Sequence, residues 1–588
     1  MAATEVNPEP APERDPAQAS APGPDATARA RGAGWRLGLG CWLLLLCVAH
    51  GNLESIDSGF TMQGARALWT RGDSGLLLPG DGAATPGEGL AAAHIAGNSG
   101  QSFGMTGKDG RHQYVWFPMG HLWLMVPPVA LGEHLQRAFP AIEARYKERA
   151  GPTYQRSELV LDQAMVALLL PSLFGATTIL LLMAIARALG STAREALGVA
   201  FAIAFTTQCF PLLRETLSDG PGLTLLLTGL WAAVRAGAGA ARPGDLVLGG
   251  LAAGFAVLVR YQHAFPVVVL AVAVALAARR HRRWPWLWCF AAGGAPMAAL
   301  LFTVNWLRFG NPMSTGYLPA DWFDTMPWIG LPKILLAAGK GILWFSPLLW
   351  IAAWAALRRR ERPPFAHGWL AWTLLWVPLL MFASTNGWQS GQCWGVRYVT
   401  GGVVAFQVLV LPQLRPWRRW PRAFAALLVL GALVNVTSLV APTRGYAQLA
   451  DQGVRAQFEQ AFAAGEVSAA DLAAVRADSA GMYFVLPRFS PLHANWSYAR
   501  QVLAGAFEDE HQRPVHGAAH TIEPLFSVTS ADPQLGLAPI WWEDRGFRWW
   551  WWVMWGELLG LPGWLLLLPP LVAGGALVRA GWRRLSRI

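Results

Sequence analysis

Charged residues and cysteines are both scarce in this sequence. Asp, Glu, Lys and Arg make up 14% of the 588 residues, whereas hydrophobic residues make up 54%. This balance is typical of a protein with many membrane spans. The five cysteines form no C-x-x-C pair, and all but Cys393 lie within apolar runs. Neither a disulfide framework nor a zinc site is therefore predicted.

The excess of positive charge, +11 at pH 7, is divided among short Arg clusters between apolar runs. Nucleic-acid binding would need a continuous basic face, so no nucleic-acid partner is expected, and the clusters are interpreted as topology signals. Apolar segments lie at about 159–186, 195–213, 217–234, 246–259, 264–278, 285–307, 333–357, 367–384, 399–413, 421–441 and 553–578. With a first helix at 35–52, they predict an all-α polytopic membrane protein of about twelve transmembrane helices.

Threading these spans alternately through a bilayer places every Arg cluster on the same side. The clusters lie at 29–36, 187–194, 235–242, 279–283, 358–362, 415–422 and 579–588. By the positive-inside rule this side is cytoplasmic, so both termini are predicted to lie inside. High usage of Ala, Arg, Gly, Pro and Trp is consistent with a GC-rich bacterium. We therefore expect a multi-pass protein of a bacterial inner membrane.

The expected division of the chain follows from this topology. It comprises a disordered cytoplasmic tail at 1–34, a first helix at 35–52, an outer loop with interfacial helices at 53–158, a transmembrane core at 159–441, a small outer domain at 442–545, and a last helix with a basic cytoplasmic end at 546–588. The apolar stretch 117–132 is short and contains Pro127 and Pro128, so it is expected to lie along the outer interface. The acidic tail argues against a signal peptide, which favours an uncleaved first helix.

Ionisable residues gather on the predicted outer side of the spans. They are Asp57, Arg214, Glu215, Asp219, Arg260, His263, Arg308, Lys340 and Arg397. Charges at a membrane boundary are costly unless they are paired or functional, so this asymmetry predicts an active site at the outer leaflet. A carboxylate there can act as a general base on an acceptor hydroxyl, while Arg and Lys neutralise a phosphate. The outer side has no nucleotide supply, so the expected donor is a lipid-linked sugar phosphate.

Several motifs resemble those of the glycosyltransferase-C membrane enzymes. The stretch ESIDSGFTMQGARALWTRGDSGL, at 54–76, is similar to the start of their first outer loop, which carries an acidic catalytic residue soon after helix one. Further similar segments are GKDGRHQYVWFPMGHLWLMVPPVALG, RETLSDGPGLTLLL, NWLRFGNPMSTGY, GKGILWFSPLL and NGWQSGQCWGVRY. Over about 35–445, their order resembles that of the bacterial relatives of the dolichyl-phosphate-mannose protein mannosyltransferases and of the aminoarabinose transferases.

This resemblance implies a membrane glycosyltransferase with a polyprenyl-phosphate-linked sugar as donor and Asp57 as catalytic base. Asp57 is followed by Ser58, where many members of the family have a second acid. The sequence SDG at 218–220 stands in place of the usual S-E-P, so Asp219 is expected to be only a supporting acid. Transfer is expected to be a single displacement that inverts the anomeric centre. The acceptor, whether a lipid, a glycan or a protein, is left open.

Other residues have expected roles around this base. Those expected to bind the donor phosphate are Lys340, Arg397, Arg260 and Arg308. Those expected to support the site are Asp219, Glu54 and the aromatic residues Tyr317 and Trp394, whose rings would stack on the sugar or flank the lipid. Lys340 is expected to lie within an apolar helix, between two glycines, where its charge needs an anion.

These residues also have simpler structural interpretations. Asp57 would then be a polar residue at a helix boundary, Glu54 a solvated residue, and Arg260 a snorkelling side chain. Asp57 together with Glu54 or Asp219 offers oxygen ligands that suit magnesium or manganese. The cations can take the place of a metal at the phosphate, so no obligatory metal is expected.

Two other classes of function remain as alternatives. A transporter or flippase for a lipid-linked or anionic solute would also be basic inside, but it would be expected to contain internal repeats and ionisable residues near the middle of the membrane. A non-catalytic scaffold would need neither Asp57 nor Lys340 near a cavity. The convergence of Asp57, Lys340 and Arg397 at one place is the observation that separates a transferase from both.

Overall fold

The structure, a computed structural model, describes most of the chain. It covers residues 24–51, 55–83, 86–97, 104–150, 160–316, 325–358, 367–385, 387–390, 393–440, 457–477 and 547–585, with a few shorter stretches between them. Nearly all of the regular structure is helical, which confirms the predicted all-α fold. Most of the predicted outer domain at 442–545 lies outside the described residues.

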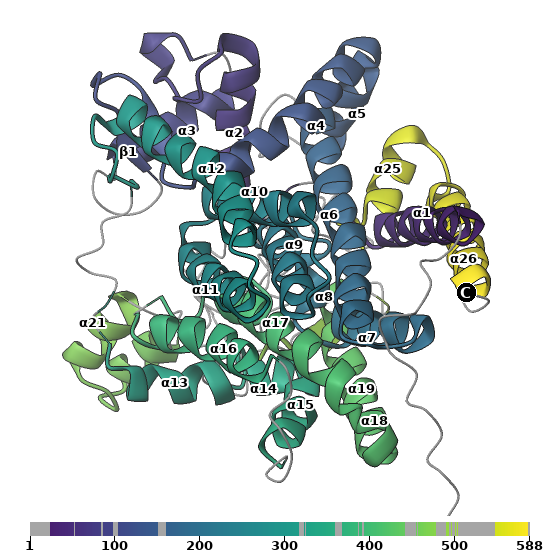
Figure 1. Cartoon of the computed structure of the whole chain (residues 1–588). Helices are drawn as coiled ribbons and strands as arrows, with labels where there is room; N and C mark the ends of the chain where they lie inside the picture. Colours follow the sequence, from purple (N-terminus) through teal and green to yellow (C-terminus); the bar gives the residue numbers. More distant parts are fainter. Residues whose placement is uncertain are drawn as a thin grey trace, which may run out of the picture.

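The chain begins with α1 (Pro24–Leu46) and then forms a unit of short elements, seen at the upper left and centre of Figure 1. These are α2 (Ile56–Arg71), η2 (Pro79–Asp81), α3 (Pro86–Gly97), β1 (Gly104–Thr106), β2 (Gln113–Val115), α4 (Met119–Ala138) and α5 (Pro140–Ala150). The two strands are antiparallel, with Met105 opposite Tyr114. An apolar cluster that includes Leu76 and Val115 joins α2 and α3 to this hairpin.

The remaining helices form the apolar bundle and its attachments. They are α6 (Val160–Ala188), α7 (Ala193–Thr206), α8 (Cys209–Leu212), α9 (Asp219–Gly237), α10 (Pro243–Val259), η3 (Tyr261–His263), α11 (Ala264–Arg280), α12 (Pro285–Phe309), α13 (Pro327–Leu336), α14 (Ile342–Phe345), α15 (Leu348–Leu357), α16 (Gly368–Ala383), α17 (Arg397–Leu414), α18 (Pro416–Arg419), α19 (Pro421–Val436), η5 (Thr437–Leu439), α21 (Ala469–Ala477), α25 (Trp551–Leu559) and α26 (Gly563–Leu585). Helix α17 lies at the centre, where nearly all of its apolar side chains are buried.

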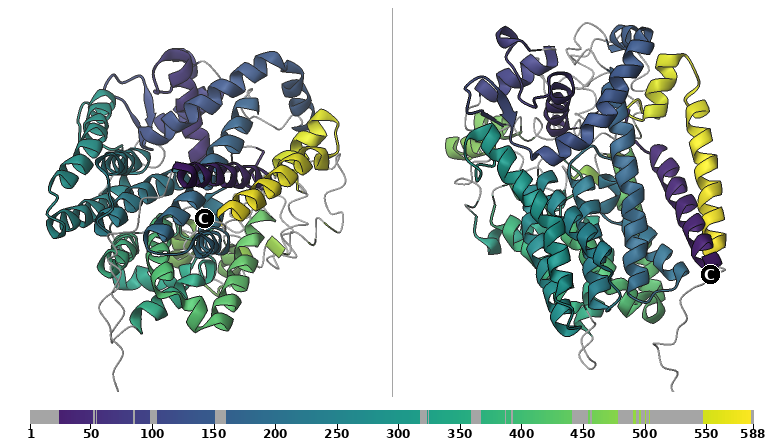
Figure 2. Two further views of the ribbon diagram at one scale, coloured as in Figure 1. Left: turned by 45° about the vertical axis from the view of Figure 1, so that its right-hand side comes forward. Right: turned by 45° about the horizontal axis from the view of Figure 1, so that its top comes forward.

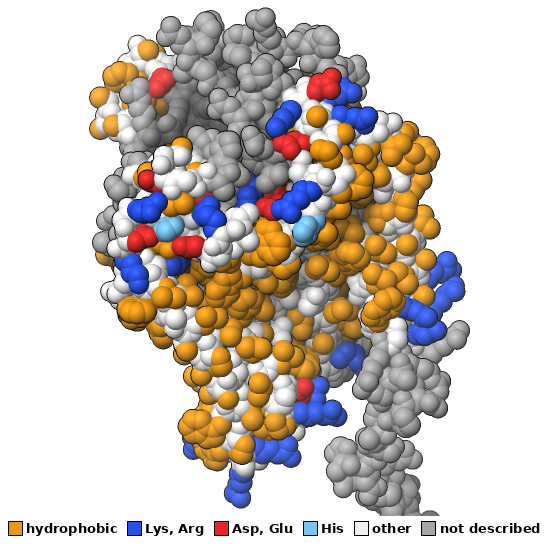
Figure 3. All heavy atoms as spheres, turned by 90° about the horizontal axis from the view of Figure 1, so that it is seen from above, with side chains coloured by type: hydrophobic (Ala, Val, Ile, Leu, Met, Phe, Trp, Pro, Cys, Tyr) orange, Lys and Arg blue, Asp and Glu red, His pale blue; other side chains and the backbone are white. Residues whose placement is uncertain are grey.

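The apolar helices make this a multi-pass membrane protein. Five of the described helical segments are long and apolar enough to cross a bilayer, namely Leu161–Ala188, Tyr261–Arg280, Pro285–Phe309, Pro421–Leu439 and Gly563–Leu585. Figure 3 shows a broad band of hydrophobic side chains between a patch of mixed acidic and basic residues and an edge that is mostly basic. The total of about twelve spans stays a prediction, because the other apolar helices are shorter than this limit.

Two predicted spans are interrupted. The segment 333–357 is not one helix but α13, α14 and α15, because Gly339 and Gly341 form a turn and Pro347 starts a new helix. The segment 553–578 is divided between α25 and α26 by a left-handed turn at Gly560. A hydrophobic run alone does not reveal such breaks.

The predicted boundary of the N-terminal tail is also wrong. Helix α1 begins at Pro24, ahead of the expected start at residue 35. Proline suits the first turn of a helix, and the Ala and Arg residues that follow it are good helix formers. The first 23 residues lie outside the described part of the chain.

Helix α4 runs across the predicted outer ends of two bundle helices. A Cβ atom at Gly120 would lie 2.6 Å from the carbonyl of Leu258, near the end of α10. One at Gly132 would lie 2.2 Å from the Cα atom of Asp162, in the first turn of α6. Both helix ends are on the same predicted side, so α4 lies along that side of the bundle. The position of the stretch 117–132 at the membrane interface stays a prediction.

Close glycine contacts join pairs of bundle helices. Where α10 crosses α12, a Cβ atom at Gly293 would lie 2.1 Å from the carbonyl oxygen of Val247. The first and last helices are paired in the same way, because a Cβ atom at Gly40 of α1 would lie 2.8 Å from the backbone nitrogen of Val578 in α26. Figure 2 shows α1 and α26 side by side. Small residues at these crossings allow the backbones to approach.

Candidate active site

Asp57 lies in the first turn of α2, where the partial positive charge of the helix end favours a carboxylate. Ser55 caps the helix and accepts a hydrogen bond from the Asp57 backbone at 3.2 Å. The next residue, Ser58, donates its hydroxyl to the Thr216 carbonyl at 3.1 Å. The residue that replaces the expected second acid therefore fixes the start of α2 to the turn between α8 and α9.

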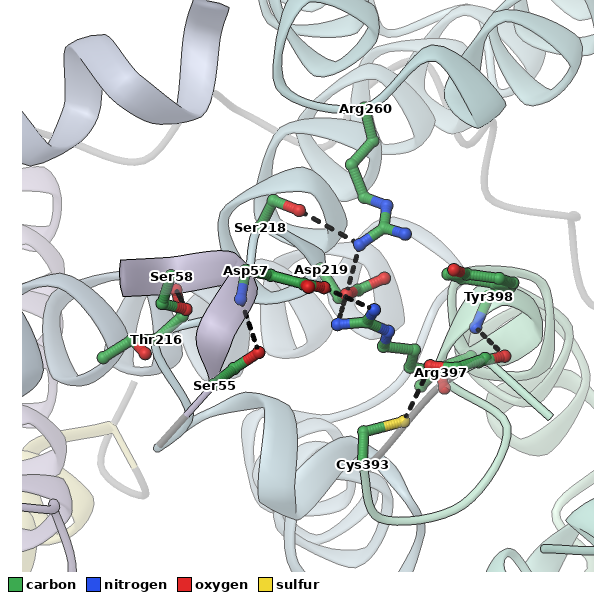
Figure 4. A network of polar contacts seen from close by, with 12 residues as sticks. Ser55, Asp57, Ser58, Thr216, Ser218, Asp219, Arg260, Cys393, Arg397 and Tyr398 are labelled. Atoms are coloured by element: carbon green, nitrogen blue, oxygen red, sulfur yellow. Dashed lines mark hydrogen bonds and ion pairs between the residues drawn. The ribbon is translucent and has the colours of Figure 1, made fainter. Parts of the chain in front are cut away.

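Arg397 brings two carboxylates together. It is the first residue of α17, and its Nη2 atom donates a hydrogen bond to Oδ2 of Asp57 at 2.9 Å. Its Nη1 atom lies 3.7 Å from Oδ2 of Asp219, the first residue of α9. Figure 4 shows the guanidinium between the two acids. Helix ends that are far apart in the sequence thus meet at one point.

Arg260 provides the second cation at the same point. Its Nη1 atom donates to Oδ2 of Asp219 at 2.5 Å and to the Ser218 hydroxyl at 3.0 Å. It follows the last residue of α10, which places its side chain across the start of α9. We call Asp57, Asp219, Arg260 and Arg397 the charge cluster.

The ring of Tyr398 supports both guanidinium groups of the charge cluster. Its centroid lies 4.9 Å from Cζ of Arg260 and 5.4 Å from Cζ of Arg397. Phe382 packs against the same ring with 4.7 Å between the centroids. Cation–π contacts of this kind favour guanidinium groups on an aromatic face and limit where they can move.

Exposure differs among the members of the cluster. The side chains of Asp219 and Arg397 are 3% and 7% exposed, whereas that of Asp57 is 23% exposed. Asp57 is therefore the member most open to a molecule that approaches from outside the bundle.

Lys340 contacts the loop that precedes Arg397. Its side chain is fully buried in the turn between α13 and α14, and its ammonium donates to the carbonyl of Cys393. It also lies 3.4 Å from the Cys393 sulfur. Cys393 belongs to the loop that leads into Arg397. The expected position of Lys340 within a continuous helix is wrong, because the flanking glycines form a turn.

Three of the expected site residues lie elsewhere or outside the described chain. Arg308 is buried, donates to the Val115 carbonyl and lies 4.7 Å from the Tyr114 ring, so it fastens the end of α12 to the hairpin. Glu54 and Tyr317 lie outside the described residues.

Trp394 is packed in the protein interior. Its side chain is 2% exposed and forms an edge-to-face contact with Phe345, with ring centroids 5.2 Å apart. An aromatic ring buried in this way has no open face for a sugar. The structure therefore favours a packing role for Trp394 over the expected stacking role.

His121 borders the cluster from α4. Its Nε2 atom lies 3.1 Å from the Thr216 carbonyl. Burial lowers the pKa of His121 to about 4, and the Arg260 guanidinium adds to this effect, while the contact with Thr216 opposes it. The imidazole is thus neutral near pH 7 and contributes no charge to the cluster.

The charges of the cluster balance, since two carboxylates face two guanidinium groups. Such an arrangement can hold a carboxylate ready as a base and offers cations to a phosphate. Within the described residues, no group of three or more His, Cys, Asp or Glu side chains is arranged to hold a metal ion.

Sequence reasoning missed Ser218, His121 and Tyr398 as neighbours of the cluster. Ser218 and Tyr398 are adjacent in sequence to Asp219 and Arg397, and both lie inside motifs that resemble the family. His121 gives no such signal, because only the packing of α4 brings it near α9.

Part of the charge cluster lies in a segment that matches a known protein family. No curated protein matches the chain in sequence. Two solved structures of ArnT from Cupriavidus metallidurans are similar to this chain. The structure bound to undecaprenyl phosphate has 14% sequence identity and a TM-score of 0.45, and the match covers 90% of this chain and 77% of that one. The structure in the apo state has 17% identity and a TM-score of 0.41, and the match covers 85% of each chain. Residues 157–306, which carry Asp219 and Arg260, match the dolichyl-phosphate-mannose-protein mannosyltransferase family. Over this segment the match confirms the family resemblance expected from the motifs.

Proposed function

We propose that the protein is a membrane glycosyltransferase that moves a sugar from a polyprenyl-phosphate donor to an acceptor hydroxyl on the outer face of the membrane. The observation that carries this proposal is the position of Arg397 between Asp57 and Asp219, with Arg260 beside them. The family that residues 157–306 match is described by a donor of this class, dolichyl-phosphate mannose.

In the proposed reaction Asp57 accepts the proton of the acceptor hydroxyl as its oxygen attacks the anomeric carbon. The bond between that carbon and the phosphate oxygen breaks, and its electrons stay on the phosphate. The products are the glycoside, the polyprenyl phosphate and a protonated Asp57. Because attack and departure occur on opposite faces, the anomeric centre is inverted.

The proposed roles of the cations follow from their contacts. Arg397 and Arg260 stabilise the negative charge that develops on the leaving phosphate. Asp219 holds both guanidinium groups and is a positioning residue. Lys340 is assigned to the loop before Arg397, because its ammonium binds the Cys393 carbonyl. The gathering of charges at helix ends favours this function over a transporter, whose ionisable groups would lie near the middle of the membrane.

An assay with defined polyprenyl-phosphate sugars tests the proposal. Membranes that contain the wild-type protein are expected to transfer sugar, and Asp57→Asn is expected to lower the rate by about 10²–10⁴-fold, the usual contribution of a general base. Asp81→Asn is the matched control, because it removes a carboxylate from an exposed turn of the same outer segment. Unchanged transfer by Asp57→Asn would remove Asp57 from the mechanism.

A further inference from the structure

Arg397 retains hydrogen-bonding capacity beyond its contact with Asp57. A guanidinium has five N–H donors. In the described part of the chain, Nε of Arg397 is buried without a hydrogen-bond partner, and Nη1 reaches Asp219 only at 3.7 Å. The Asp57 carboxylate, bound at Nη2, is its one close acceptor among the hydrogen bonds of the described residues. A phosphate could satisfy these remaining donors.

Asp57 also covers Arg397. The carboxylate is 23% exposed and the guanidinium behind it only 7%. Asp219 approaches the same guanidinium from the buried side, where it also binds Arg260. An anion that arrives from outside therefore meets Asp57 first, and Asp219 keeps Arg397 in place when the contact with Asp57 is lost.

The charge balance of the cluster also indicates that a phosphate must replace Asp57 at Arg397. Two acids and two cations sum to zero, so an added phosphate finds no net positive charge while Asp57 is ionised and paired. This obstacle disappears if the phosphate replaces Asp57 at Arg397.

From these contacts we infer that Arg397 is exchanged between Asp57 and the donor phosphate, so that Asp57 becomes available to the acceptor only after the donor has bound. This inference rests on the proposed function and adds an order of events to it. Asp57 then occupies the phosphate site at Arg397 until the donor binds, and it also acts as the base. When Asp57 later takes the acceptor proton, the cluster gains one positive charge, which matches the extra negative charge on the departing phosphate.

Binding of a short-chain polyprenyl monophosphate to the purified full-length protein tests this exchange. Asp57→Asn removes the carboxylate that competes with the phosphate for Arg397. The variant is therefore expected to bind the polyprenyl monophosphate about tenfold more tightly, because one charge-assisted hydrogen bond no longer has to be broken. Asp57→Glu keeps a carboxylate and is expected to bind like the wild type, as is Asp81→Asn. The corresponding polyprenol, which lacks the phosphate, is expected to bind all four proteins equally.

The outcomes separate this inference from the proposed function. Unchanged or weaker binding of the polyprenyl phosphate by Asp57→Asn would overturn the exchange, as would an equal gain for the polyprenol. In either case a loss of transfer in Asp57→Asn would still support the proposed function. Conversely, tighter binding with full transfer would support the exchange and reject Asp57 as the base. Thermal unfolding of each variant shows that the comparison is made between folded proteins.

Discussion

The guanidinium of Arg397 binds the carboxylate of Asp57 at 2.9 Å, although the two residues are 340 positions apart in the sequence. The contact joins the first turn of α2 to the first residue of α17. Asp219 and Arg260 extend it to α9 and α10. Four helix ends are thus connected through side chains whose charges cancel.

Replacing Arg397 is expected to abolish most transfer. Arg397→Gln removes the cation nearest to Asp57, and the loss of one such stabilising donor typically lowers kcat by about 10²–10³-fold. Arg397→Lys keeps the charge but not the forked geometry, so a smaller loss is expected. The control is Arg419→Gln, which removes an exposed Arg from the predicted cytoplasmic side. Steady-state transfer rates check this, and equal rates for Arg397→Gln and the control would contradict it.

Asp219→Asn is expected to affect stability as well as activity. The buried carboxylate neutralises both guanidinium groups, and removing one partner of a buried ion pair costs about 3–5 kcal/mol. Thermal unfolding in detergent should show a lower Tm than for Asp57→Asn, whose carboxylate is more exposed. A second change, Arg260→Met, should restore part of the loss because it removes the unpaired charge. Equal Tm values for the two Asn variants would argue against this role for Asp219.

Lys340→Met is expected to act through the loop before Arg397. The change leaves the Cys393 carbonyl without the ammonium that now binds it, a loss of about 1–3 kcal/mol for a buried group. We expect a lower Tm and a lower kcat, with little change in KM for the donor. A raised KM with an unchanged Tm would instead place Lys340 in direct contact with the phosphate.

Two adjacent glycines of α12 should respond differently to the same substitution. A Cβ atom at Gly293 would lie 2.1 Å from the backbone oxygen of Val247, so Gly293→Ala must push α10 and α12 apart. Overpacking of this kind costs about 1–3 kcal/mol. At Gly294 the nearest atom is 3.5 Å away, so Gly294→Ala should leave the Tm nearly unchanged. Similar Tm values for the two variants would contradict the crossing seen here.

The sequence predicts the helices better than it predicts their contacts. Apolar runs locate most of the bundle helices, because burial in a bilayer demands long apolar segments. The break at Lys340 is missed, because a turn made of Gly339 and Gly341 leaves the run apolar. The pairing of Asp57 with Arg397 depends on the packing of distant helices, so only their shared predicted side of the membrane could be expected. The burial of Lys340 and Trp394 could not be predicted for the same reason, since neither burial nor partners can be read from a loop motif.

The role of Asp57 as the base is the central step of the proposed reaction, and a single-turnover experiment tests it. Wild-type protein and Asp57→Asn, each saturated with the same radiolabelled polyprenyl-phosphate sugar, are mixed with acceptor, and the rate of glycoside formation is measured. Because the donor is already bound, differences in affinity do not contribute. If Asp57 is the base, the rate is lower by about 10²–10⁴-fold in the variant. Equal rates would show that Asp57 is not the base.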